Sequence, residues 1–267
     1  MIKNSFIFIP GIGEKTEQYL WRKGILTWND LERIHLSILN RTKRKIIEDH
    51  LELAKAALDK MDSSFFAKYL PQREYWRLFR DFRPKTLFLD IETTGLSLYY
   101  DIITVIGTFD AYKNKIKIFL RDNNLGDIRN YLQDYEIVVT FNGKLFDIPF
   151  IKKEFPEIKF PPIHIDLRFL LRSLGLTGPL KDIEKKVGIG REKDIQEING
   201  REAAVLWSKF VKGDDGALKK LLLYNIYDTI NLEKLMQFVY ITKIEKDILP
   251  KMKNNFRSSP HFVGLQK

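Results

Sequence analysis

Two acidic residues at the end of a short apolar stretch have the type and spacing that could bind a metal ion. The stretch from Thr86 to Gly95 reads TLFLDIETTG and contains Asp90 and Glu92 shortly before its glycine. If the stretch is a strand, Asp90 and Glu92 lie on one face, and Leu87, Leu89 and Ile91 lie on the opposite face. The two carboxylates then lie roughly 6 to 7 Å apart, and burying both is costly unless a cation lies between them. The alternative is a solvated strand end, which an isolated D-x-E motif favours.

A third acid follows a second apolar stretch. Residues 137–141 (IVVTF) form a continuous apolar run that is typical of a strand buried on both faces. Asp147 comes six residues later, at the start of a predicted helix that carries Pro149 in its first turn. Aspartate is also a favoured helix N-cap, so Asp147 taken alone is either a cap or a ligand.

A fourth acid lies on a late helix, paired with a tyrosine. Steps of three and four define its inward-facing stripe: Leu218, Leu221, Tyr224, Asp228, Leu232 and Leu235. Tyr224 and Asp228 are therefore one turn apart within an apolar face. An aspartate there needs a cation or a hydrogen-bond partner, and a satisfied Asp–Tyr pair in the core is the alternative to a site.

The elements that must position these residues form an α/β fold. Strands are predicted at 86–92, 102–111, 115–120, 137–141 and 163–165, and helices near 127–132, at 149–155 and over most of the chain after 165. Three meandering strands followed by β–α units predict a mixed five-stranded sheet flanked by helices. His164 lies in the last predicted strand and Asp166 directly follows it, and both are expected to be structural.

The order of these motifs resembles that of the DnaQ-like exonucleases of the RNase H-like superfamily, in the tyrosine variant of the DEDD group. More narrowly, residues 85 to about 238 resemble the YprB-like branch through DIETTGL, FNGKLFDIPFI, HIDL and YNIYD. The resemblance implies that the metal ligands are Asp90, Glu92, Asp147 and Asp228, and that Tyr224 orients the attacking water. It also implies that the terminal nucleotide is held by Thr93, Thr94, Gly95, Leu96, Asn142 and Phe146.

Four carboxylates and the absence of cysteine favour two hard divalent cations, Mg²⁺ or Mn²⁺. The expected reaction is two-metal hydrolysis of phosphodiesters, releasing nucleoside monophosphates from the 3′ ends of single-stranded DNA or RNA. Two alternatives stay open. One is an RNase H-like endonuclease that makes internal cuts, and the other is a catalytically silent nucleic-acid-binding module.

The composition agrees with a nucleic-acid partner. The 267 residues carry a net charge of +10, and residues 1–84 hold 16 Lys+Arg against 11 Asp+Glu, which is half of that excess. Their basic cluster comprises Arg41, Lys43, Arg44 and Lys45. No apolar run approaches the ~20 residues that a membrane span needs, and no secretory signal is recognisable, so a cytoplasmic protein without a membrane partner is expected.

The beginning of the chain suggests a small appendage. Residues 2–9 are strand-like, and a turn with Gly11 and Gly13 precedes a helix predicted from Glu14 to Trp21. Thr27 and Asp30 then indicate a capping box for the next helix. The glycine turn partly resembles a helix-hairpin-helix module, so it is either a structural turn or a cradle for phosphate. The expected organisation is a basic, mainly helical segment at 1–84, an exonuclease domain at 85–240 and a tail at 241–267.

Overall fold

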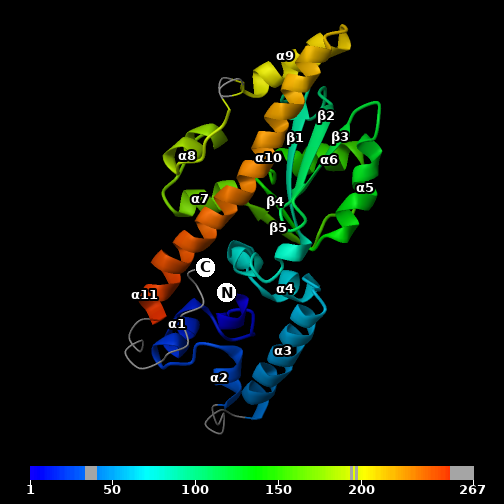
Figure 1. The fold of residues 1–267 in the computed structure, drawn as a ribbon. Helices are drawn as coiled ribbons and strands as arrows, with labels where there is room; N and C mark the ends of the chain where they lie inside the picture. Colours follow the sequence, from blue (N-terminus) through cyan, green and yellow to red (C-terminus); the bar gives the residue numbers. More distant parts are fainter. Residues whose placement is uncertain (34–40, 193–194, 196–197, 253–267) are drawn as a thin grey trace. The chain divides into compact units, whose positions relative to one another are not determined.

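The computed structural model describes residues 1–33, 41–192, 195 and 198–252 (Figure 1). The chain divides into two compact units: Met1–Asp81 with Tyr240–Lys267, and Phe82–Val239. The three segments expected from the sequence, with boundaries at 84/85 and 240/241, stay a prediction. The last 15 residues of the expected tail lie outside the described residues.

The second unit contains a five-stranded mixed sheet with the strand order β3-β2-β1-β4-β5. The strands are β1 (Thr86–Thr93), β2 (Ile103–Asp110), β3 (Lys115–Leu120), β4 (Ile137–Thr140) and β5 (Ile163–Asp166). The pairs β1–β2 and β2–β3 are antiparallel, whereas β1–β4 and β4–β5 are parallel. The predicted mixed sheet is therefore confirmed. The strand β1 lies at its centre.

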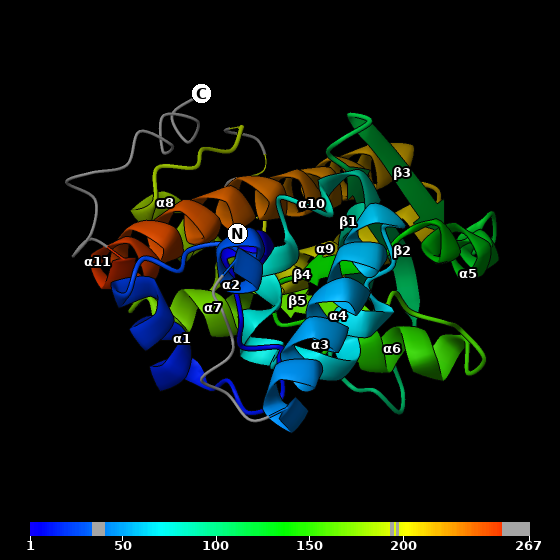
Figure 2. The same ribbon diagram turned by 90° about the horizontal axis from the view of Figure 1, so that it is seen from below.

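Helices cover both faces of this sheet (Figures 1 and 2). Leu87, Leu89 and Ile91 face a core that includes residues of α5 (Ile128–Tyr131) and α6 (Asp147–Glu154). On the other face, Val105 packs with residues of α9 (Gly200–Val211) and α10 (Asp215–Lys243). This confirms the predicted alternation along β1, which turns its two acids toward α10.

The remaining helical elements of this unit are short. They are η4 (Arg83–Lys85), η5 (Leu125–Asp127), η6 (Leu132–Asp134), α7 (Leu167–Ser173) and α8 (Leu180–Lys186).

The predicted inward stripe of α10 is confirmed: its residues from Leu221 to Leu235 are buried at the expected positions, and Leu218 packs at the edge of the same core.

The first unit is helical. Its elements are η1 (Ile2–Asn4), α1 (Glu14–Arg22), α2 (Trp28–Arg33), α3 (Arg41–Asp59), α4 (Ser64–Tyr69), η3 (Gln72–Leu78) and, after the end of α10, η8 (Ile244–Ile248) and α11 (Leu249–Met252). The predicted capping box is confirmed, because the Thr27 amide donates to the Asp30 carboxylate at 2.8 Å and the Asp30 amide to the Thr27 hydroxyl at 3.2 Å. The basic cluster forms the exposed first turn of α3.

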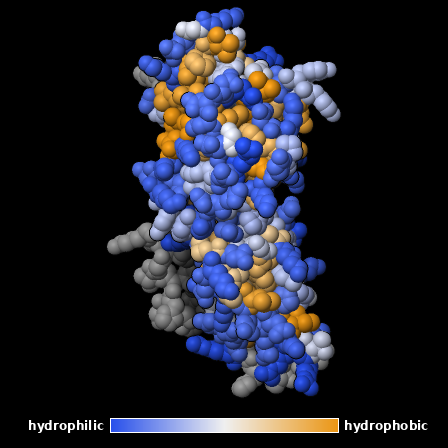
Figure 3. Space-filling model, turned by 90° about the vertical axis from the view of Figure 1, so that its right-hand side faces the viewer, coloured by the Kyte–Doolittle hydropathy of each residue, from blue (hydrophilic) through white to orange (hydrophobic). Residues whose placement is uncertain are grey.

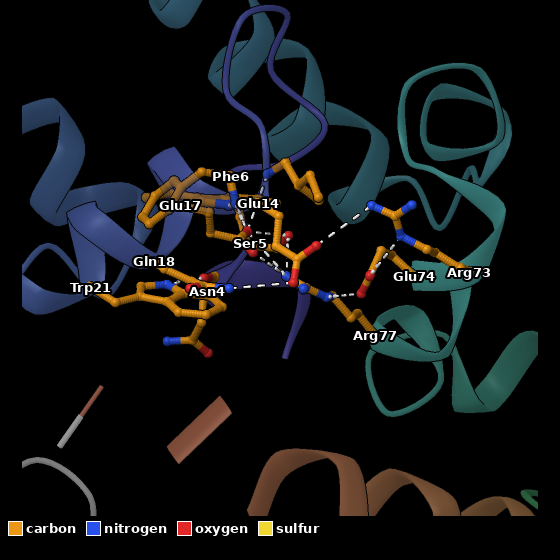
Figure 4. Close-up of polar contacts among 12 residues, drawn as sticks. Asn4, Ser5, Phe6, Glu14, Glu17, Gln18, Trp21, Arg73, Glu74 and Arg77 are labelled. Carbon is orange, nitrogen blue, oxygen red and sulfur yellow. Dashed lines mark hydrogen bonds and ion pairs between the residues drawn. The ribbon is translucent and has the colours of Figure 1, made fainter. Parts of the chain in front are cut away.

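The strand predicted at residues 2–9 is wrong. This stretch forms a short 3₁₀ helix followed by turns. The reason is the buried carboxylate of Glu17, which accepts hydrogen bonds from the backbone amides of Phe6 and Ile7 at 2.6 and 3.1 Å. Arg77 neutralises this carboxylate at 2.9 Å, and Ser5 donates to it as well (Figure 4). A side chain thus supplies the acceptors that a neighbouring strand would have provided.

The side of the molecule in Figure 3 is mostly hydrophilic, with scattered groups of hydrophobic residues. In the part of the chain that the structure describes, none of the helices is long and apolar enough to cross a membrane.

Candidate metal centre

Three of the predicted acids meet between β1 and α10. Asp90, Glu92 and Asp228 each offer a carboxylate oxygen, and these oxygens lie within 4.8 Å of one another. Glu92 and Asp228 are buried and Asp90 is partly buried. The two residues from β1 share a face because the side chains of a strand alternate, and Asp228 joins them from the helix packed on that face.

Asp147 is the first residue of α6 and faces the same cavity. The N-cap position belongs to Phe146, and no side-chain capping bond forms there. The Oδ1 atom of Asp147 is buried and has no hydrogen-bond partner among the described residues. A buried carboxylate oxygen without a partner is costly in a native fold, so its environment fits a cation ligand better than a cap.

The electrostatics of the cluster follow from burial and from like charge. Burial is the main cause that raises the pKa of Asp90 and Glu92 well above the usual range, and the charge of Asp228 raises both further. Burial also raises the pKa of Asp147 to about 8. The pKa of Asp228 is raised by burial as well, although Arg191 opposes that shift. In the metal-free cluster, protonation of these acids therefore competes with the binding of a cation.

The cluster contains a positively charged side chain, Arg191, that was not predicted from the sequence. Arg191 forms an ion pair with Asp228, and its guanidinium also donates to both oxygens of Glu184, with Nε–Oε2 and Nη2–Oε1 distances of 2.5 and 2.7 Å. Both partners of the second pair are nearly inaccessible to solvent. Glu184 lies on α8, so this bidentate pair fixes the guanidinium beside Asp228.

The close approach of α10 to the sheet depends on a glycine and an asparagine. Gly107 on β2 is the partner of Asp90 in the β1–β2 register. A Cβ atom at Gly107 would lie 2.0 Å from Oδ1 of the buried Asn225. Asn225 in turn donates to the Asp90 carboxylate at 3.0 Å. A glycine inside an apolar strand was the available signal for such a close approach.

Tyr224 lies one turn before Asp228, as predicted, and lines the cavity. Burial is the main cause that raises the pKa of its hydroxyl, and the charge of Asp228 and a hydrogen bond to that carboxylate add to the shift. The hydroxyl therefore stays protonated at neutral pH. It can donate a hydrogen bond but not act as a base.

A cavity of about 730 Å³ opens at the acids. All six residues predicted to hold the terminal nucleotide line it: Thr93, Thr94, Gly95, Leu96, Asn142 and Phe146. The beginning of α9 lines it too, with the N-cap Asn199 and with Gly200, Arg201 and Ala204, and sequence reasoning missed this contribution. Gly11 and Gly13 belong to the first unit. Their phosphate contact stays a prediction.

The loop before Asp147 is held in place by Asp166. Its carboxylate accepts hydrogen bonds from the backbone amides of Asn142 at 2.8 Å and Lys144 at 3.0 Å. His164, the other residue expected to be structural, contacts the Thr140 hydroxyl through its Nε2 atom at 2.9 Å. Both residues thus make structural contacts, and Asp166 fixes the approach to α6.

The fold and the cluster agree with the family comparison. The sequence profile described as the RNase H superfamily matches residues 87–240, which is more than half of the chain. The chain therefore belongs to the RNase H superfamily. No curated protein matches it.

Solved structures resemble the chain at low sequence identity. The family B DNA polymerase of the hyperthermophilic archaeon Pyrobaculum calidifontis is 14% identical with a TM-score of 0.47, and the match covers 63% of this chain but only 26% of the polymerase. NrnC of Brucella melitensis with bound Mg²⁺ is 15% identical with a TM-score of 0.43, covering 63% of this chain and 78% of NrnC. The same NrnC bound to pGG is 16% identical with a TM-score of 0.43, covering 66% and 79%.

Proposed function

We propose that the chain is a metal-dependent 3′–5′ exonuclease that releases nucleoside monophosphates from single-stranded nucleic acid, of the DEDD tyrosine type and the YprB-like branch. The observation that carries this proposal is the cluster of Asp90, Glu92 and Asp228, whose oxygens lie within 4.8 Å of one another in a cavity large enough for a nucleotide. Membership of the RNase H superfamily supports it.

The proposed ligands are Asp90, Glu92, Asp147 and Asp228. They offer only oxygen atoms, which suit Mg²⁺ or Mn²⁺. The unpartnered Oδ1 of Asp147 and the raised carboxylate pKa values agree with a site built for cations. When bound, two such ions supply activation of a water molecule and neutralise charge on the leaving oxygen of a phosphodiester.

The chain's own residues orient and enclose the substrate in this proposal. Tyr224 stays protonated and its hydroxyl hydrogen-bonds to Asp228, so in this proposal it orients the attacking water by hydrogen bonding and does not remove its proton. Phe146, whose ring packs against Phe150 with centroids 4.7 Å apart, offers an apolar wall to the terminal base. Arg201 from α9 adds a positive charge to the cavity lining for the phosphate groups.

The test uses DNA and RNA strands labelled at the 3′ or the 5′ end, incubated with Mg²⁺, Mn²⁺ or EDTA. We expect a 5′-labelled strand to shorten one nucleotide at a time, and a 3′-labelled strand to release labelled mononucleotide at once. EDTA and the Asp90→Asn variant should abolish both. Internal fragments would instead identify an endonuclease, and metal-independent binding without cleavage would identify a silent binding module.

A further inference from the structure

The loop that joins β1 to β2 presents the most exposed large apolar side chains among the described residues. Leu96, Tyr99 and Tyr100 are 80%, 87% and 90% exposed. The next most exposed, Val211, reaches 67%. Single exposed apolar residues need no explanation, but three within five residues of one loop do.

Hydrogen bonds inside the loop hold its backbone. The Asp101 carboxylate accepts from the Thr94 hydroxyl at 2.9 Å and from the Ser97 amide at 2.8 Å. Gly95 makes this possible, since a Cβ there would lie 2.5 Å from an oxygen of Asp101. The Thr94 amide also donates to the Ile102 carbonyl at 3.0 Å. The two tyrosines therefore project from a fixed backbone, so ordering them on a ligand costs little entropy.

The loop is also fastened to the elements that carry the acids. Lys153 on α6 donates its ammonium protons to the Tyr99 carbonyl at 3.2 Å and the Asp101 carbonyl at 3.1 Å. The same helix begins with Asp147, and the loop itself continues from the strand that carries Glu92. Leu96 lines the cavity. Tyr99 and Tyr100 follow Leu96 within four residues on the same fastened loop.

We propose that Leu96, Tyr99 and Tyr100 form a stacking surface for the unpaired bases of a nucleic-acid strand whose end occupies the cavity. This inference rests on the proposed function and narrows its substrate to strands with several unpaired nucleotides. Tyrosine rings stack on any base, so this surface does not select sequence. A duplex keeps its bases stacked inside and gains nothing from it.

The test compares a Tyr99→Ser/Tyr100→Ser variant with the wild-type chain. Binding of a fluorescent 12-nucleotide single strand is measured by anisotropy in EDTA. We expect the dissociation constant to rise at least tenfold, because base stacking is lost. Binding of a blunt duplex of the same length should not change. A Tyr99→Phe/Tyr100→Phe variant keeps the rings and should bind the single strand like the wild type.

Tyr112 provides the matched control. It is 62% exposed in the turn between β2 and β3. The strand register places this turn at the far end of the sheet from Glu92. A Tyr112→Ser variant should bind the single strand normally. Unchanged single-strand affinity in the double serine variant overturns the stacking surface, and so does an equal loss with the duplex. Wild-type cleavage is measured in parallel, so its absence overturns the proposed function separately.

Discussion

Arg191 and Asp228 bring opposite charges together at the candidate metal centre. The guanidinium is held by Glu184 and pairs with Asp228, beside two further carboxylates. In the metal-free chain this arginine is a built-in counter-ion for the cluster. Removing one partner of a buried ion pair leaves the other uncompensated, and this usually costs more than the pair contributes.

We therefore expect Arg191→Met to destabilise the metal-free protein by about 3–5 kcal/mol. Addition of Mg²⁺ should raise the melting temperature of this variant more than that of the wild type, since the cation replaces the missing charge. Thermal unfolding in EDTA and in Mg²⁺ measures both effects. Arg172→Met, at an exposed position of α7, is the control. Equal melting temperatures of Arg191→Met and wild type in EDTA would contradict the role as counter-ion.

Asp147 should make the stability of the metal-free protein depend on pH. Burial raises its pKa from the usual 3.8 to about 8, so between these values the folded state binds a proton that the unfolded chain releases. Stability then falls as the pH rises through this window. Urea unfolding in EDTA at several pH values should show this fall, and Asp147→Asn should weaken it. An identical pH profile in the variant would contradict the raised pKa.

At the scale of elements, the site depends on how closely α10 packs against β2. A side chain at Gly107 would collide with Asn225 and with the Thr229 hydroxyl, which would lie 2.0 and 2.7 Å from the new Cβ. We expect Gly107→Ala to cost about 1–3 kcal/mol and to weaken metal binding by displacing Asp228. Calorimetry and unfolding curves measure both. Gly126→Ala, which meets only the end of Arg129 at 3.4 Å, is the control. Unchanged metal affinity in Gly107→Ala would show that the acids tolerate the shift.

The sequence predicts the elements with strong periodicity and misses what depends on tertiary contacts. The alternation along β1 and the stripe on α10 are set by local spacing, so both are recovered. Arg191 lies in a loop with no periodicity, and Glu184 reads as an ordinary surface charge on α8. Only the fold brings these two together. The stretch at residues 2–9 was misread as a strand because its apolar residues pack in a helical unit, with Glu17 supplying the acceptors.

At the scale of the whole molecule, the basic first turn of α3 is the natural candidate for added affinity to nucleic acid. We expect replacement of Arg41, Lys43, Arg44 and Lys45 by Gln to weaken strand binding and to reduce the salt slope by roughly 0.7 per lost contact with a single strand. Binding titrations at several salt concentrations measure the slope. The control replaces four exposed lysines: Lys209, Lys212, Lys219 and Lys220. If the salt dependence of binding is unchanged in the α3 variant, the first turn of α3 does not contact the nucleic acid.

The central claim is that the buried acids bind divalent cations, and Mn²⁺ binding measured by electron paramagnetic resonance tests it most directly. We predict saturable binding of two ions per wild-type chain, in line with a two-metal phosphodiesterase site. Asp90→Asn should lower the affinity at least tenfold while the fold stays intact, and Asp127→Asn, at an exposed position, should bind like the wild type. An Asp90→Asn variant that binds Mn²⁺ with wild-type affinity and stoichiometry, or a wild-type chain that binds none, would contradict the account.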